Sequence, residues 1–148
     1  MQALKKYLII FLILNIVFAV AYALISYFLH INLGQGIINT AISAWVAGMT
    51  FCKDHRRLPS KEEKKSLING SFIIAIILTV VGIGLMSLGN YLETGTTGIE
   101  NMNSSLLIVS LLIGLGLTYL ILWVSYGWLL NFTGKRMLTK LADQETRK

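Results

Sequence analysis

The chain has 148 residues, of which 55% are hydrophobic and 14% are charged, and its formal net charge is +6. Soluble domains carry about 25% charged residues, so this composition excludes an ordinary water-soluble domain and favours a membrane protein. The lone cysteine, Cys52, excludes a disulfide within the sequence. Residues 1–148 leave no room for a second soluble domain, and we expect a single membrane domain.

Four apolar segments of the chain are long enough to cross a membrane. A membrane helix needs about 20 mostly apolar residues, because the hydrocarbon layer is about 30 Å thick and each helical residue rises about 1.5 Å. None of the four segments contains a proline or a charged side chain. We therefore predict an all-α fold, a polytopic bundle of four transmembrane helices with spans near residues 7–29, 33–51, 67–91 and 105–132.

The first predicted span has some features of a secretory signal peptide. Two lysines precede it, and the alternate alanines from Ala19 to Ala23 resemble a cleavage site. The apolar run continues past these alanines as far as Phe28, which favours a retained span. The connection to the second span, residues 30–32, is so short that the two helices must be antiparallel neighbours.

The second predicted span is rich in small and polar residues. Its members Gly36, Thr40, Ala44 and Gly48 recur every four residues, a spacing that lets membrane helices approach closely. We expect this span to be the packing hub, and Trp45, on the opposite side, to face lipid. The rest of the small and polar face is formed by Asn39, Ser43, Ala47 and Thr50.

The other three spans carry analogous stripes, and together the stripes predict the bundle interior. Polar groups there either pair across helices as structural contacts or line a substrate path; the structural interpretation is favoured because such hydrogen bonds are common in membranes. Asn15 and Asn39 are the best candidates for a path, since an amide left unpaired in hydrocarbon is costly. The stripes comprise Asn15, Ala19, Tyr22 and Ser26 in the first span, Ser71, Ala75, Thr79 and Gly82 in the third, and Ser110, Gly114, Thr118 and Ser125 in the fourth.

Aromatic residues are placed mainly toward the ends of the spans. Tyr7, Trp123, Tyr126 and Trp128 lie toward the ends that we assign to the cytoplasmic side, as expected of an interfacial belt. Tyr119 lies near the middle of the fourth span, so we expect its hydroxyl to find a buried acceptor.

The loop between the second and third spans, residues 52–66, contains a pattern that marks the start of a helix. Ser60 is followed three residues later by Glu63, which is the pattern of a capping box, so the third helix is expected to begin near Lys61.

This loop also resembles an uncharacterised family of small four-helix bacterial inner-membrane proteins. In that family a Phe is followed by Arg, then by Arg-x-Pro-x-x-x-Glu, and Gly-Ser opens the third span. The resemblance implies a bacterial inner membrane and a part in envelope maintenance or drug tolerance, and it brings no catalytic residue. The matching positions are Phe51, Arg56, Arg57, Pro59, Ser60, Glu63 and Ser71.

All 13 lysine and arginine residues fall in three regions: ahead of the first span, in the loop 52–66 and in the tail 133–148. With an even number of spans these regions share one membrane face, which the positive-inside rule predicts to be cytoplasmic, together with both termini. The opposite loop, residues 92–104, carries only two glutamates as charged residues. This topology explains the net charge of +6 without a nucleic-acid partner.

The sequence contains few residues in the patterns that form catalytic or metal-binding sites. None of the four spans contains a charged residue, although proton- and cation-coupled carriers usually need one. The potential ligands Cys52, Asp54 and His55 adjoin one another in the inner loop, but no second pair stands at zinc-finger spacing. We therefore expect no catalytic residue, no metal site and no cofactor.

These features favour a non-enzymatic protein of the lipid bilayer that acts by interaction with itself or with another membrane protein. The alternative is a small transporter or channel that operates as a homo-oligomer, with the polar stripes lining its path. An enzyme acting on lipid is a third, less favoured interpretation.

Overall fold

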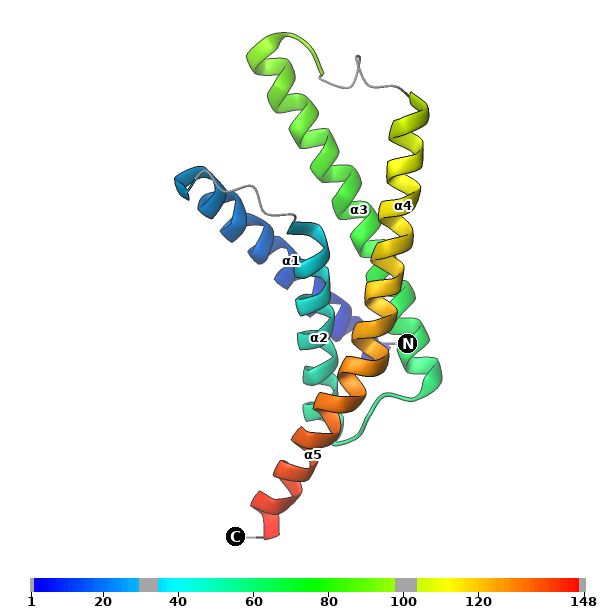
Figure 1. Ribbon diagram of the computed structural model, residues 1–148. Coiled ribbons are helices and arrows are strands. Elements are labelled where there is room, and N and C mark those ends of the chain that lie inside the picture. Colours follow the sequence, from blue (N-terminus) through cyan, green and yellow to red (C-terminus); the bar gives the residue numbers. More distant parts are fainter. Residues whose placement is uncertain (1, 30–34, 98–103, 147–148) are drawn as a thin grey trace.

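The computed structural model describes residues 2–29, 35–97 and 104–146, and this part of the chain is helical with no strand. Its elements are α1 (Gln2–Leu29), α2 (Gln35–His55), α3 (Lys61–Thr94), α4 (Ser104–Val124), the π-helical turn η1 (Ser125–Leu129) and α5 (Leu130–Thr146). The last three follow one another without a break and form a single rod, which we call the α4–α5 rod (Figure 1). The predicted all-α fold is confirmed.

Three stretches of these helices are long and apolar enough to cross a membrane: Leu4–Ile25, Lys61–Thr94 and Ile108–Gln144. The predicted second span, 33–51, is not among them. The described helix α2 begins only at Gln35, contains several small and polar residues and ends in charged ones. The predicted connection 30–32 lies outside the described residues. The fold is thus a helical bundle compatible with a membrane protein, and a fourth span through α2 stays a prediction.

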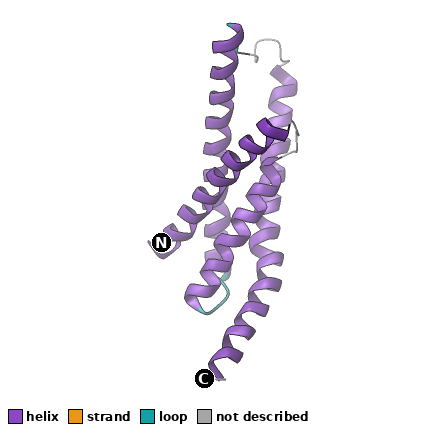
Figure 2. Cartoon of the chain, turned by 90° about the vertical axis from the view of Figure 1, so that its left-hand side faces the viewer, coloured by secondary structure: helices purple, strands orange, loops and turns teal. Residues whose placement is uncertain are grey.

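The four long helices converge at one end and diverge toward the other (Figures 1 and 2). The α2–α3 loop and the two chain ends lie toward the converging end, whereas α1 leans away from α3 and α4 at the diverging end (Figure 1). Large apolar side chains are exposed along the diverging halves. Such surfaces are compatible with lipid, which solvates apolar side chains as readily as a protein core does.

The buried core lies at the converging end. It joins the first turns of α1 and α3 to the last turns of α2 and to the middle of the α4–α5 rod. The side chains of Phe11 and Tyr126 are fully covered there, which fixes the distance between the helices that carry them. The core comprises Tyr7, Phe11, Ala44, Ala47, Phe51, Cys52, Leu67, Ile68, Leu122, Tyr126 and Leu130.

Helix α2 contacts α1, α4, η1 and α5, which is the position expected of a packing hub. Ala44 and Ala47 are fully buried, and a Cβ atom added at Gly48 would lie 2.8 Å from Cδ2 of Leu130. Small residues therefore let α2 lie close against the α4–α5 rod.

The other small residues assigned to helix packing lie apart from any neighbouring helix. A Cβ atom added at Gly36, Gly82 or Gly114 would have nothing within 4 Å. The physical reason is the divergence of the helices, which separates these three positions from the elements that the stripe pattern would bring against them. The sequence pattern identified small faces correctly but did not show where along the helices they meet.

Trp45, which we expected to face lipid, also contacts α5. Its indole is half-buried, and Nε1 donates a hydrogen bond to Oγ1 of Thr133 at 3.0 Å. Thr133 belongs to α5, which continues the rod beyond η1 and packs against this side of α2.

We expect Gly48→Leu to lower the free energy of unfolding by about 1–3 kcal/mol, because overpacking a close contact forces side chains and helices apart. The measurement is denaturation of the purified protein in detergent, followed by circular dichroism. Gly116→Leu on α4 is the matched control, since a Cβ atom there meets nothing within 4 Å. An equal loss of stability in both variants would show that the close approach of α2 to Leu130 does not matter.

Candidate functional site

Most of the specific side-chain interactions of the protein gather at the converging end, which we call the junction (residues 4–11, 44–74 and 122–137). Polar, aromatic and charged side chains there connect α1, α2, α3 and the α4–α5 rod.

The first contact joins α1 to the end of α2. Lys6 Nζ donates to Asp54 Oδ2 at 2.7 Å, and the Tyr7 hydroxyl donates to the same oxygen at 3.1 Å. The hydrogen bond from Lys6, followed by that from Tyr7, holds the pKa of the Asp54 carboxyl below its usual range. Asp54 is therefore ionised at neutral pH and pairs with Lys6 rather than offering a free carboxylate.

An aromatic cluster lies beside this pair. The rings of Tyr7 and Phe51 pack edge to face with centroids 5.1 Å apart, and His55 packs on Phe51 with centroids 4.5 Å apart. The Arg57 guanidinium lies 5.4 Å from the centre of the Phe51 ring, within the range of a cation–π interaction. Phe51 thus links α1 to the beginning of the α2–α3 loop.

The loop is closed by Glu63, the residue that the capping box predicted. Ser60 is the N-cap of α3, its side chain accepts from the Glu63 backbone N–H, and its own N–H donates to Glu63. Glu63 also accepts two hydrogen bonds from Arg57, each 2.7 Å long. The predicted capping box is therefore present. The Glu63 carboxylate also orients Arg57 toward Phe51.

Two further features shape this loop. Arg56 ends α2 with a φ of 54°, a left-handed conformation that side-chain-bearing residues seldom adopt. Pro59 is buried, and Leu58 lies against Gly134 of α5, where an added Cβ atom would be 2.8 Å from Leu58 Cδ2. The loop is therefore packed against the α4–α5 rod.

The α4–α5 rod is tied to α3 by two polar contacts. Lys64 Nζ donates to Asn131 Oδ1 at 2.7 Å, and the hydroxyls of Ser71 and Tyr126 lie 3.0 Å apart in the buried core. Ser125 is buried beside Tyr126 in the π-helical turn. Tyr126, which we expected in an interfacial belt near the end of its span, is fully buried in the core of the converging end.

Four of the residues predicted for a polar interior donate hydrogen bonds to backbone carbonyls of their own helices. Asn15 Nδ2 donates to the Phe11 carbonyl at 3.0 Å. Thr40, Thr79 and Thr118 likewise donate to the carbonyl four residues earlier, at 2.7, 2.8 and 2.8 Å. These hydroxyls therefore need no partner on another helix. The structure does not bring them together as interhelical contacts.

Other members of the predicted interior are placed differently. Ser43 is buried and its Oγ has no hydrogen-bond partner, while Asn39 is half-buried and makes no hydrogen bond to any residue that the structure describes. Tyr22 is half-buried, and the side chain of Ser26 lies outside the described residues. Only Asn39 and Ser43 thus leave polar groups available on the α2 face.

Tyr119 does not have the buried acceptor that its mid-span position suggested. Its side chain is 41% exposed, and its ring packs edge to face on Phe72 of α3 with centroids 5.3 Å apart. The contact with Phe72 therefore covers only part of the Tyr119 side chain.

Two ion pairs of the junction, Lys6–Asp54 and Arg57–Glu63, and the buried Cys52 account for several of its ionisable groups. Burial raises the pKa of the Cys52 thiol, which keeps it protonated and unreactive. Among the described residues no group of three or more His, Cys, Asp or Glu side chains could hold a metal ion. The junction is built as a structural connection between helices.

Comparison of the chain with family models, with curated proteins and with solved structures finds no match in any of the three. The resemblance of the inner loop to a family of small inner-membrane proteins therefore stays a prediction. The structure does bring three of its positions, Phe51, Arg57 and Glu63, into one chain of contacts.

The Ser71–Tyr126 pair gives a test of how the junction holds α3 to the rod. We expect Ser71→Ala to destabilise the protein more than Tyr126→Phe, because it leaves the buried tyrosine hydroxyl without a partner, whereas a lone serine can donate to its own helix. A double-mutant cycle in detergent should give a coupling of about 0.6–1.7 kcal/mol.

The order of the two single variants is the decisive result. If Tyr126→Phe is the more damaging, or if the cycle shows no coupling, the 3.0 Å contact between the two hydroxyls does not connect the helices as described.

Proposed function

We propose that this chain is a multi-pass protein of the bacterial inner membrane, with four spans and with both termini and the α2–α3 loop in the cytoplasm. Three apolar helices of membrane-spanning length support insertion. The placement of all 13 lysine and arginine residues before, between and after the predicted spans on one side supports the orientation. With α2 as the fourth span, the junction lies at the cytoplasmic surface and the helices diverge toward the other side.

Reporter fusions test this topology. A reporter that is active only in the cytoplasm should be active when fused after Arg57 or after Lys148, because both positions follow clusters of positive charge. A reporter that is active only outside the cytoplasm should be active after Gly98. Activity of opposite reporters at Arg57 and Lys148 would exclude an even number of spans between them.

Within that membrane we propose that the protein acts by lateral association with a second copy of itself or with another membrane protein, in envelope maintenance or drug tolerance. One observation carries this proposal: the diverging half of α3 presents small residues that no helix of the same chain covers. A Cβ atom at Gly82 or Gly89 would meet nothing within 4 Å. Membrane helices associate through such small faces, because close backbone contact replaces the missing hydrophobic driving force.

The small residues of α3 lie on one side of that helix. At about 100° per residue, Ala75, Thr79, Gly82 and Gly89 fall within one quadrant. Gly84 lies on the opposite side, among the bulky residues Val80, Val81, Leu88 and Tyr91. Met86, at about 20° from Ala75 on the same scale, is the one large side chain within that quadrant between Ala75 and Gly89. The Gly82 side therefore offers mostly small residues to a second helix, whereas the Gly84 side is bulky.

This pair of glycines provides a matched test of association. We expect Gly82→Leu to weaken self-association by about 5- to 30-fold, the equivalent of about 1–2 kcal/mol, while Gly84→Leu leaves it unchanged. The measurement is energy transfer between donor- and acceptor-labelled copies in vesicles at varied protein-to-lipid ratio. A chain that stays monomeric in every variant, or equal effects of the two substitutions, would contradict association through the Gly82 side.

The alternative proposal is a small transporter or channel that operates as a homo-oligomer. It is favoured by Asn39, whose half-buried amide makes no hydrogen bond to any described residue and so is free to face a permeant. An Asn39→Asp protein that folds and associates normally but shows altered ion or drug flux in liposomes would favour this alternative.

A further inference from the structure

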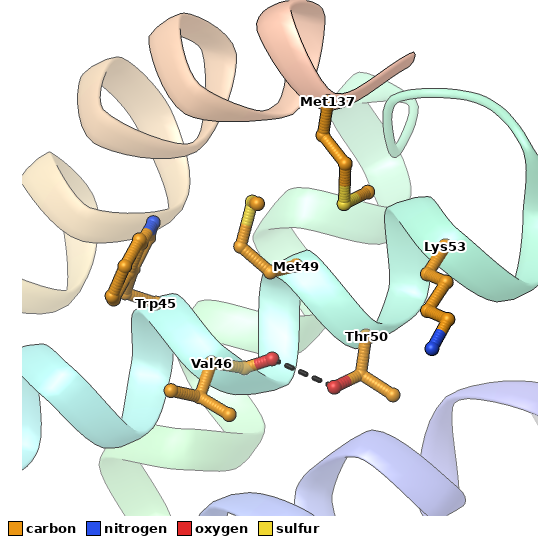
Figure 3. A pocket seen from close by; sticks show the side chains of 6 residues that line it. All are labelled: Trp45, Val46, Met49, Thr50, Lys53 and Met137. Carbon is orange, nitrogen blue, oxygen red and sulfur yellow. Dashed lines mark hydrogen bonds between the residues drawn. The ribbon is translucent and has the colours of Figure 1, made fainter. Parts of the chain in front are cut away.

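A shallow groove opens between α2 and α5 at the junction, on the side of α2 that carries Trp45 (Figure 3). Its volume is about 210 Å³. Met49 from α2 and Met137 from α5 flank it, and the lining is almost wholly apolar (Figure 3). The lining residues are Trp45, Val46, Met49, Thr50, Lys53 and Met137.

The polar groups of the lining, Lys53 apart, are already bound within the protein. Trp45 Nε1 donates to Thr133 Oγ1 at 3.0 Å, and Thr133 Oγ1 donates in turn to the Leu129 carbonyl at 2.8 Å. Thr50 Oγ1 donates to the Val46 carbonyl at 2.9 Å (Figure 3). These bonds hold the indole in place before any ligand binds. The floor of the groove therefore contacts a ligand through apolar groups.

The size and lining of the groove restrict the class of ligand. Sites for drug-sized molecules usually have volumes of about 300–1,000 Å³, so this groove suits a slimmer occupant. The thioethers of Met49 and Met137 are flexible and polarisable, which lets them pack around a chain that has no fixed conformation. Both features fit a single hydrocarbon chain.

Lys53 supplies the one charge at the groove. Its side chain is exposed and forms no ion pair with any residue that the structure describes. Lys53 lies eight residues after Trp45 on α2, which places its Cα about 12 Å further along the helix. A ligand with an anionic head at Lys53 would therefore extend an apolar tail of roughly that length toward Trp45.

We propose that this groove binds an anionic phospholipid of the surrounding membrane, with one acyl chain between Met49 and Met137 and the phosphate paired with the Lys53 ammonium. A free phosphate is a poorer occupant, because the apolar floor gives it no hydrogen-bond donor besides Lys53. A neutral lipid lacks the charge that complements Lys53. This proposal requires that the protein lies in a membrane, and it does not depend on association through the Gly82 side.

Quenching of Trp45 fluorescence tests the site. In the Trp123→Phe/Trp128→Phe background Trp45 is the only tryptophan, and both replaced side chains are largely exposed. The full chain is reconstituted in phosphatidylcholine vesicles that contain increasing fractions of phosphatidylglycerol brominated on its acyl chains. We expect quenching to reach half its maximum at an about fivefold lower fraction than with brominated phosphatidylcholine, because one lysine contributes about that factor at an anionic site.

Two variants separate the groove from general surface charge. Lys53→Gln should abolish the preference for phosphatidylglycerol, while Lys65→Gln, which removes an equal charge from an exposed position on α3 outside the groove, should retain it. Val46→Phe should fill the groove and reduce quenching by both lipids. Circular dichroism and thermal melts of each variant show that the fold is kept.

Several outcomes would overturn the proposal. Equal quenching by the two brominated lipids in the parent protein would show that there is no headgroup recognition. Equal losses in Lys53→Gln and Lys65→Gln would show attraction by overall charge rather than by this groove. Removal of the phosphatidylglycerol preference by inorganic phosphate, beyond the effect of sodium chloride at equal ionic strength, would indicate a free-anion site instead of a lipid site.

Discussion

The close approach of α2 to the α4–α5 rod determines where the other elements can lie. Gly48 has no side chain where Leu130 passes, and Ala44 and Ala47 are fully buried on the same helix. Because α2 also packs against α1, the position of α1 follows from this contact. Helix α3 is then fixed by its own contacts with the rod, of which the Ser71–Tyr126 pair is the most deeply buried.

Ion pairs and hydrogen bonds from hydroxyls to the backbone lie in different parts of the bundle, according to what surrounds each part. Charged pairs such as Lys6–Asp54 and Arg57–Glu63 lie at the end of the bundle that carries the basic loop, where water can hydrate whatever the partner leaves unsatisfied. Along the apolar halves of the helices, hydroxyls such as that of Thr79 bond to their own backbone. This division places most specific contacts between the described helices at one end of the bundle and leaves large apolar side chains exposed along the rest.

Features that depend on local sequence were predictable, and features that depend on helix registration were not. Ser60 and Glu63 form the expected capping box because all its atoms belong to consecutive residues. The four long helices follow from apolar run length, although α2 falls short of the apolarity of the others. The full burial of Tyr126 and the hydrogen bond from Trp45 to α5 depend on how the α4–α5 rod lies against the other helices, which local sequence does not specify. The groove beside Lys53 arises only where α2 and α5 meet, so no single segment signals it.

The contact between Trp45 and Thr133 joins residues 88 positions apart, and this separation has a consequence for biosynthesis. Chains grow at about 5–20 residues per second, so roughly 4–18 s pass between the synthesis of the two residues. During that interval the Trp45 indole, Cys52 and Leu58 are not yet covered by α5. The nascent protein therefore leaves one side of α2 uncovered until its last segment arrives, and α5 completes the assembly.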